Sequence, residues 1–398
     1  MLFKSAISTV AESDRAIQDI CREVTRDLGG KTVDLSFLFF SQHHREGINE
    51  WVPYIRKEIG PQVLLGCTGE GIIGGGQELE QRPAVCLWVA HLTGVDIVPF
   101  HLTFRQTSGG FSVEGFPEKL AASHQSRFFL LLAEPFSTPG SELLKFLQEK
   151  CPGVPAVGGM ASGAMDYGQN RLIFNDRVLN EGVVGVALGG AISLQTVVSQ
   201  GCRPIGERFI ITRADGNVIY ELGGSPALEC LQRVYSGMPT QEQRLARQGF
   251  HLGCAIDEHK SQFERGDFLV RNVIGADEET ASIAVTDLVK EGQTVQFHIR
   301  DRETASEDLQ WLLTTRNEES KKPAVAGALL FSCNGRGQRL FGGPHHDITA
   351  IRRQIGDIPV AGFFAQGEIG PVGGKNFLHG FTASVALFSD PPWADSGS

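Results

Sequence analysis

The chain has 398 residues, of which 41% are hydrophobic and 21% are charged, a composition typical of a globular protein with about two or three domains. A net charge of -10 and a pI near 5.6, without a dense block of Lys or Arg, argue against nucleic acid or an anionic membrane as a partner. No stretch predicts a signal peptide or a membrane span, so we expect a soluble, cytoplasmic protein. The eight cysteines include no CxxC pair, which argues against a zinc ribbon.

The first predicted unit has the order strand, helix, strand, strand. The apolar run 33–41 predicts a buried strand, and apolar residues at helical spacing follow within 48–59. The runs 62–67 and 84–92 predict two more strands. Between them lies a glycine-rich loop with the sequence GCTGEGIIGGG (66–76).

The same order recurs twice further along the chain, which predicts an internal repeat. The second unit has its strands at 127–135, 154–164 and 183–188, and the third at 324–332, 358–364 and 377–388. The third unit also repeats the glycine-rich loop, as GFFAQGEIGPVGG (362–374). The second unit carries Ala164 where the others carry Glu70 and Glu368, so the fold itself does not require the glutamate.

A segment of different character, 206–318, separates the second unit from the third. Asp215-Gly216 predicts a tight hairpin turn, and several short alternating runs follow. We therefore predict a mixed α/β fold in which the repeated units form mixed sheets and an antiparallel α+β segment is inserted. The predicted regions are 1–205, with two units, and 206–398, with the insert and the third unit at 324–388.

The loop at 69–74 matches the G-x-G-x-x-G pattern of dinucleotide-binding sites. Such a loop must open a helix whose first N–H groups face the phosphates, whereas another strand is predicted here. The nucleotide interpretation therefore fails, and no cofactor is predicted. One interpretation of the glycines is purely conformational, with positive φ angles in the loops and solvated glutamates.

The other interpretation places a ligand site where the loops of the first and third units converge at strand ends. In the first unit the candidate side chains are Thr68 and Glu70. In the third they are Cys333, Asn334, Arg336, Gln366 and Glu368. Arg336, between two glycines, is suited to hold a carboxylate with its planar fork, although pairing with a neighbouring acid is an equal alternative.

Two histidine pairs, His43-His44 and His345-His346, raise the hypothesis of a metal site. Adjacent residues point in different directions, so such a pair seldom supplies two ligands to one ion, and no metal site is predicted. Asp347 after the second pair is a suitable N-cap for the helix that follows. Cys333 as a nucleophile with one of these histidines as base is conceivable, but no catalytic residue is assigned.

The segments FSCNGRG (331–337), PVAGFFAQGEIGPVGG (359–374) and FLHGFTASVALF (377–388) closely resemble the C-terminal signature of FIST-domain proteins. The segments 64–75 and 154–162 resemble the N-terminal FIST region, and 211–231 is similar to the start of the C-terminal region. The resemblance covers roughly residues 30 to 388.

This resemblance implies a sensory or signal-transduction module that binds a small ligand, such as an amino acid, rather than an enzyme. FIST regions occur beside kinase or chemoreceptor output domains, for which this chain has no additional length, so a stand-alone form would act through a separate partner or as a homo-oligomer. On this basis we expect Arg336 to hold a ligand carboxylate and Glu368 or Glu70 to accept from its ammonium group. The alternatives are a hydrolase or transferase that uses Cys333 or a metal, and a protein-interaction scaffold.

Overall fold

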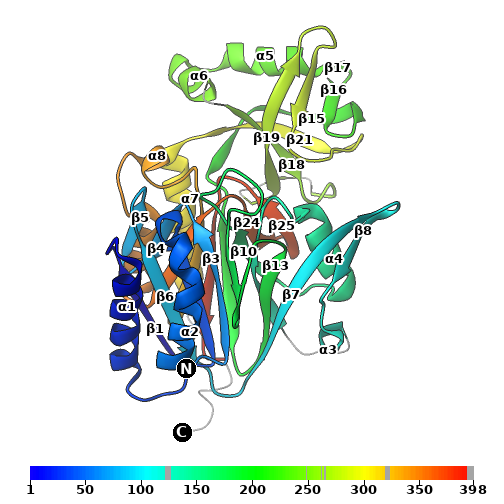
Figure 1. Cartoon of the computed structure of the whole chain (residues 1–398). Helices are drawn as coiled ribbons and strands as arrows, with labels where there is room; N and C mark the ends of the chain where they lie inside the picture. Colours follow the sequence, from blue (N-terminus) through cyan, green and yellow to red (C-terminus); the bar gives the residue numbers. More distant parts are fainter. Residues whose placement is uncertain (122–126, 248, 261, 264–265, 319–322, 392–398) are drawn as a thin grey trace. The chain divides into compact units, whose positions relative to one another are not determined.

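The computed structural model describes residues 1–121, 127–247, 249–260, 262–263, 266–318 and 323–391. The chain divides into two compact units (Figure 1). The first unit comprises Met1–Ser199 and Leu309–Ser398, and the second comprises Gln200–Asp308. Helices and mixed sheets occur together, which confirms the predicted mixed α/β class. Within the residues that the structure describes, no helix combines the length and the apolar character needed to cross a membrane.

The first unit contains three sheets. The strand order of the first sheet is β1 (Leu2–Ser8), β6 (Val85–His91), β2 (Leu35–Ser41), β3 (Val63–Gly69), β11 (Leu172–Phe174), β12 (Arg177–Leu179). The order of the second is β25 (Lys375–His379), β24 (Glu368–Val372), β10 (Ala156–Met160), β9 (Arg127–Ala133), β13 (Val183–Gly190), β7 (Val95–Thr107), β8 (Gly110–Glu114). The order of the third is β14 (Ser193–Ser199), β26 (Ala383–Ser389), β22 (Val325–Cys333), β23 (Val360–Ala365), β4 (Gly71–Gly74), β5 (Gln77–Glu80).

Each sheet is built around the same arrangement of three strands. The central strand (β2, β9 or β22) runs parallel to the next long strand of its segment (β3, β10 or β23) and antiparallel to the last (β6, β13 or β26). A hairpin from a different segment of the chain then extends each sheet: β4–β5 pairs with β23, β24–β25 with β10, and β11–β12 with β3. Every sheet thus depends on a distant segment to become complete.

A close backbone approach also recurs in the three sheets. In each parallel pair one glycine lies in register with a leucine of the central strand, and a Cβ atom on that glycine would overlap the leucine carbonyl oxygen. The three pairs are Gly66 with Leu38, Gly158 with Leu131, and Gly362 with Leu330. Only glycine fits at these positions without displacing the neighbouring strand.

The sheets of the first unit are buried on both faces. Along β2, Phe37 and Phe39 belong to a central apolar cluster shared by all three sheets, whereas Leu38 and Phe40 pack against helices. This two-residue alternation between two apolar environments explains why the strands read as continuous apolar runs. Figure 1 shows α1 and α2 beside the strands of the first sheet.

The helices of the first unit follow the same division. The first sheet packs against α1 (Ser13–Leu28) and α2 (Ile48–Glu58), and the short η1 (Gln42–Gly47) precedes α2. The second sheet packs against α3 (Glu118–Ala121) and α4 (Gly140–Lys150). The third sheet packs against α9 (His346–Ile355) and the later part of α7 (Arg302–Glu318). The one-turn α8 (Gln338–Phe341) lies between β22 and α9.

The second unit is an antiparallel sheet with two helices, as predicted for the insert. Its strand order is β15 (Cys202–Asp215), β21 (Thr294–Arg300), β18 (Phe250–Ala255), β19 (Phe268–Asp277), β20 (Ser282–Val285), β16 (Val218–Leu222), β17 (Ser225–Pro226). A further pairing of β15 with β16 across the turn at Gly216 closes the sheet into a barrel. The helices α5 (Ala227–Gly237) and α6 (Thr240–Ala246) contribute to its apolar core.

Candidate functional site at the strand ends

Loops from all three sheets meet where the parallel strands end. Ser162, directly after β10, is fully buried, and its hydroxyl donates to the carbonyl oxygen of Phe364 on β23. The same hydroxyl accepts the N–H of Glu70 at 2.8 Å, and Gln42 Nε2 donates to the Ser162 carbonyl oxygen at 3.4 Å. One serine therefore joins β23 to the loops that follow β2 and β3.

Four residues that follow the strand ends near this junction are exposed or partly exposed: Glu70, Asn334, Arg339 and Gln366. We call this group the strand-end rim. Arg339 Nη2 donates to Glu70 Oε1 at 2.6 Å, and Arg339 Nη1 donates to the Asn334 carbonyl oxygen at 3.2 Å. The side chains of Arg339 and Glu70 are 53% and 30% exposed, and Gln366 is exposed as well. The rim thus offers a positive group, a negative group and amides within reach of solvent.

Arg339 was not among the predicted site residues. A sequence signal for it existed, because Arg339 follows the same strand-end loop as Asn334 and Arg336. The loop forms α8 rather than continuing as an open turn, and this brings Arg339 back toward Glu70.

Thr68 lies below the rim in a buried polar network. Its hydroxyl donates to Asn170 Oδ1 at 3.1 Å, and Asn170 Nδ2 donates to Glu134 Oε1 at 3.2 Å. Glu134 Oε2 accepts from the backbone N–H groups of Phe136 and Ser137. Glu134 directly follows β9, as Gln42 directly follows β2, a position that could have identified it from the sequence. The network holds the loops in place.

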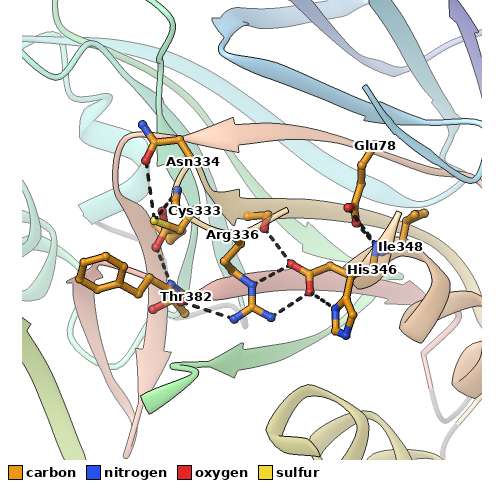
Figure 2. Close-up of polar contacts among 12 residues, drawn as sticks. Glu78, Cys333, Asn334, Arg336, His346, Ile348 and Thr382 are labelled. Carbon is orange, nitrogen blue, oxygen red and sulfur yellow. Dashed lines mark hydrogen bonds and ion pairs between the residues drawn. The ribbon is translucent and has the colours of Figure 1, made fainter. Parts of the chain in front are cut away.

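Arg336 lies in a different environment from the rim, because its side chain is fully buried. Figure 2 shows its polar contacts. Its Nε and Nη2 donate to the two carboxylate oxygens of Asp347, each at 2.8 Å, and Nη1 donates to the Phe381 carbonyl oxygen at 3.4 Å. The hydroxyl of Ser332 also donates to Asp347, at 2.8 Å. The fork that was expected to hold a ligand carboxylate therefore holds an acid of the chain itself.

The start of α9 differs from the prediction that Asp347 is its N-cap. The N-cap position is His345, in the left-handed region at φ 65°, and Asp347 lies inside the first turn. Glu78 of β5 accepts the N–H groups of Ile348 at 2.8 Å and His346 at 3.1 Å (Figure 2). The carboxylate of a distant strand thus replaces the local cap, because Asp347 is committed to Arg336.

The two buried carboxyls at this point have pKa values displaced in opposite directions. Burial raises the pKa of Glu78 to about 8, and the nearby charge of Asp347 adds to this increase. Burial also acts to raise the pKa of Asp347, but the charge and hydrogen bonds of Arg336 outweigh it and hold that pKa below its usual range. The bidentate arginine thus decides which carboxyl is ionised.

Cys333 and Glu368 are buried beneath the surface. The Cys333 sulfur accepts the Gly335 N–H at 3.4 Å and lies 3.8 Å from Asn334 Oδ1. Glu368, the first residue of β24, accepts the N–H of Thr382 at 3.0 Å. The structure therefore separates the seven predicted residues: Glu70, Asn334 and Gln366 lie on the rim, and Thr68, Cys333, Arg336 and Glu368 are buried.

The histidine pairs are divided between different surroundings. His44 is buried, its Nδ1 lies 3.0 Å from the Ser13 hydroxyl, and burial lowers its pKa to about 4, whereas His43 is exposed. His345 Nδ1 accepts the Glu78 N–H, and His346 Nδ1 lies 3.1 Å from Asp347 Oδ1. Across the described ranges, no group of three or more His, Cys, Asp or Glu side chains is arranged to hold a metal ion.

The glycine pattern at 69–74 covers the end of β3, Glu70 and the whole of β4, which forms a hairpin with β5. β3 ends at Gly69, and β4 begins at Gly71 and pairs with β23. A hairpin does not present the row of free N–H groups with which a helix start holds phosphate. The prediction that a strand, rather than a helix, follows this loop is confirmed.

Comparison with known families matches residues 34–225 to the FIST N domain and residues 227–371 to the FIST C domain. Two relatives from Mycobacterium tuberculosis, "Uncharacterized protein Rv0628c" (strain ATCC 25618 / H37Rv) and "Uncharacterized protein MT0656" (strain CDC 1551 / Oshkosh), are each 43% identical over 384 residues, which is 96% of this chain and 98% of theirs. "Uncharacterized protein Mb0898c" from Mycobacterium bovis is 40% identical over 385 residues, with the same coverage. FIST domains are associated with sensory signal transduction and small-ligand binding. Because the two family models together match most of its length, the chain belongs to the FIST family.

Proposed function

We propose that this protein is a sensory, signal-transduction protein that binds an amino acid or a similar small carboxylate at the strand-end rim. The observation that carries the proposal is the Arg339–Glu70 pair, in which opposite charges 2.6 Å apart remain partly exposed and Arg339 also donates to the Asn334 carbonyl oxygen. Ligand sites in α/β proteins form preferentially where loops gather at strand ends.

A zwitterionic ligand matches this pair because it can exchange partners with it. Its carboxylate takes the guanidinium of Arg339, and its ammonium group takes the carboxylate of Glu70. The side-chain amides of Asn334 and Gln366 supply neutral hydrogen bonds. Each protein charge keeps a charged partner during the exchange, so the desolvation cost of binding is limited.

Arg336 has a supporting role in this proposal. Its bidentate bond with Asp347 fixes the turn between β22 and α9, and that turn carries Asn334 and α8 with Arg339. Glu368 and Thr68 likewise support the loops from below. The rim residues, rather than these buried ones, make the contact with the ligand.

The remaining features of the proposal follow from the family and the fold. We infer three repeat units, because the three sheets share one strand arrangement and one glycine–leucine approach. We keep the region boundaries 1–205 and 206–398, a cytoplasmic location, and output through a separate partner protein or a homo-oligomer. No nucleic acid is a partner in this proposal.

A thermal-shift screen followed by calorimetry tests the site. The panel contains amino acids, small carboxylates and divalent metal ions. A ligand at about a hundred times its dissociation constant adds roughly 2.7 kcal/mol to the free energy of unfolding and raises the melting temperature visibly. The variants Arg339→Ala and Glu70→Gln should lose this binding.

Arg22→Ala is the matched control, because Arg22 is also an exposed arginine of the first unit paired with an acid, Asp19, at 3.3 Å. It should bind the ligand as the wild type does. Unchanged affinity in both rim variants would refute the site. A rise in melting temperature with metal ions alone would favour the alternative of a hydrolase or transferase. No rise in melting temperature with any compound of the panel would favour the alternative of a protein-interaction scaffold.

A further inference from the structure

The second unit has a cavity of its own, with a volume of about 460 Å³. This volume lies within the range of small-molecule pockets in proteins. The cavity lies where β15 meets the turn between α5 and α6. Its lining residues are Arg203, Pro204, Ile205, Gly206, Glu207, Arg233, Val234, Gly237, Met238, Pro239 and Glu242.

A bulge in β15 shapes one side of the cavity. The pairing of β15 with β21 shifts between Ile205 and Arg208, so that Gly206 and Glu207 are left outside the ladder. Gln296 Nε2 donates to the Gly206 carbonyl oxygen at 2.9 Å and fixes the bulge. Gly206 has φ 61°, and a Cβ atom there would lie 2.9 Å from the Val234 side chain. Bulges of this kind often redirect a side chain next to a binding site, and here the residue concerned is Glu207.

The wall of the cavity is apolar. Ile205, Val234 and Met238 belong to the core of the barrel and are between 5% and 8% exposed, and Pro204 and Pro239 extend the wall. An apolar body of a ligand would cover these side chains.

The charges around the cavity are unequal. Arg203 is held by two acids, Asp301 at 3.0 Å and Glu242 at 2.9 Å. Arg233 faces Glu207 at 3.4 Å, with side chains 60% and 65% exposed. The lining itself contains two carboxylates, of Glu207 and Glu242, and two guanidinium groups, and Asp301 outside the lining is a third carboxylate that pairs with Arg203. Glu207 has the most exposed of the three carboxylates.

Arg233 also has other partners. Its guanidinium lies 5.9 Å from the centre of the Phe209 ring, and Nη2 donates to the Cys230 sulfur at 3.6 Å. These contacts hold Arg233 in place if Glu207 leaves it and pairs with another cation.

We propose that this cavity binds a small organic cation, consisting of an amine group on a compact apolar body. The amine pairs with Glu207 at the bulge, and the apolar body packs against Ile205, Val234 and Met238. This ligand has no carboxylate, and its site consists only of residues of the second unit. The proposal therefore stands or falls independently of the strand-end rim.

Calorimetric titration of the full chain with three matched probes tests the chemistry. The probes are phenethylamine, phenethyl alcohol and phenylacetate, which share an aromatic body and differ in charge. Phenethylamine should bind, phenethyl alcohol should bind more weakly, and added salt should weaken only the amine. Absence of amine binding, or equal binding of phenylacetate, would overturn the proposal.

Two variants locate the site. Glu207→Gln removes the charge of an exposed residue and should weaken amine binding about two- to fivefold. Gly237→Leu keeps every charge but occupies the cavity, because a Cβ atom at Gly237 meets no atom within 4 Å, and it should abolish binding. The control Glu221→Gln alters an exposed acid of the same unit that pairs with Arg213 at 3.0 Å, outside the cavity, and should bind normally. Unchanged affinity in Gly237→Leu, with an unchanged melting temperature, would show that the amine binds elsewhere.

Discussion

Arg336 and Arg339 lie three residues apart in the chain, yet they belong to two regions with opposite character. Arg336 is fully buried and makes a bidentate pair with Asp347. Arg339 is 53% exposed and makes a single contact with Glu70. An arginine that pairs with a carboxylate is thus part of the protein interior in one region and accessible to a ligand in the other.

The comparison shows that burial, rather than the presence of a salt bridge, decides what an arginine can do. Removal of one member of a buried pair leaves a charge without compensation, whereas solvent compensates an exposed one. Stability should therefore depend on Arg336, and ligand binding should depend on Arg339. The predictions below test this division.

The largest effect is expected for Arg336→Ala. The substitution leaves the buried carboxylate of Asp347 without its guanidinium partner and should lower the free energy of unfolding by about 3–5 kcal/mol. Urea denaturation followed by tryptophan fluorescence reports on the first unit, in which Trp51 and Trp88 are buried. Arg339→Ala should cost less than about 1 kcal/mol in the same assay. Equal costs for the two variants would remove the distinction between the two regions.

A smaller effect is expected at Ser162, which joins Glu70 to β23. Ser162→Ala removes the acceptor for the Glu70 N–H and the donor to the Phe364 carbonyl oxygen. Leaving such groups without partners should cost about 1–3 kcal/mol. The control Ser236→Ala removes an exposed hydroxyl that donates to a helix carbonyl, and should change stability by less than about 0.5 kcal/mol. A cost for Ser162→Ala no larger than that of the control would mean that the junction contributes little to stability.

The pH dependence of stability should identify Glu78 as the buried carboxyl that holds a proton. Its pKa rises from 4.5 in the unfolded chain to about 8 in the folded protein. Between these values the folded state retains a proton that the unfolded state has released, so Glu78 stabilises the fold at low pH and this contribution is lost as pH rises. The slope is at most about 1.4 kcal/mol per pH unit.

Glu78→Gln provides the reference, because glutamine does not titrate. The stability of the wild type relative to this variant should fall as pH rises from about 5 to about 8, in urea denaturation at each pH. A relative stability that instead increases with pH would mean that the N–H groups of α9 keep Glu78 ionised.

The sequence predicted secondary structure well because buried strands and helices carry apolar residues at regular spacing. The apolar run 33–41 became β2, and the Asp215-Gly216 turn joins β15 to β16. The loops after the strands carry partly exposed or exposed polar residues, Glu70, Asn334 and Gln366, and their role as a ligand site stays a prediction.

The partners of these groups were not predictable because they come from distant segments. Glu78 caps a helix that begins 268 positions later, and β4, which follows β3 of the first sheet along the chain, pairs with β23 of the third sheet. Periodicity shows that a residue is buried but not which residue it meets. Arg336 illustrates this limit: the position next to glycines was recognised, but the bond to Asp347 depends on how α9 packs on β22.

The smallest expected effect is the coupling between Arg339 and Glu70 themselves. A double-mutant cycle with Arg339→Ala and Glu70→Ala should give a coupling energy of about 0.2–1 kcal/mol, because solvent screens a partly exposed pair. The coupling should decrease as salt is added. A ligand that exchanges partners with the pair requires this coupling to be weak, since a strong pair would compete with the ligand for both charges. A coupling above about 2 kcal/mol would make Arg339–Glu70 a structural pair like Arg336–Asp347 and would remove the basis for the proposed site.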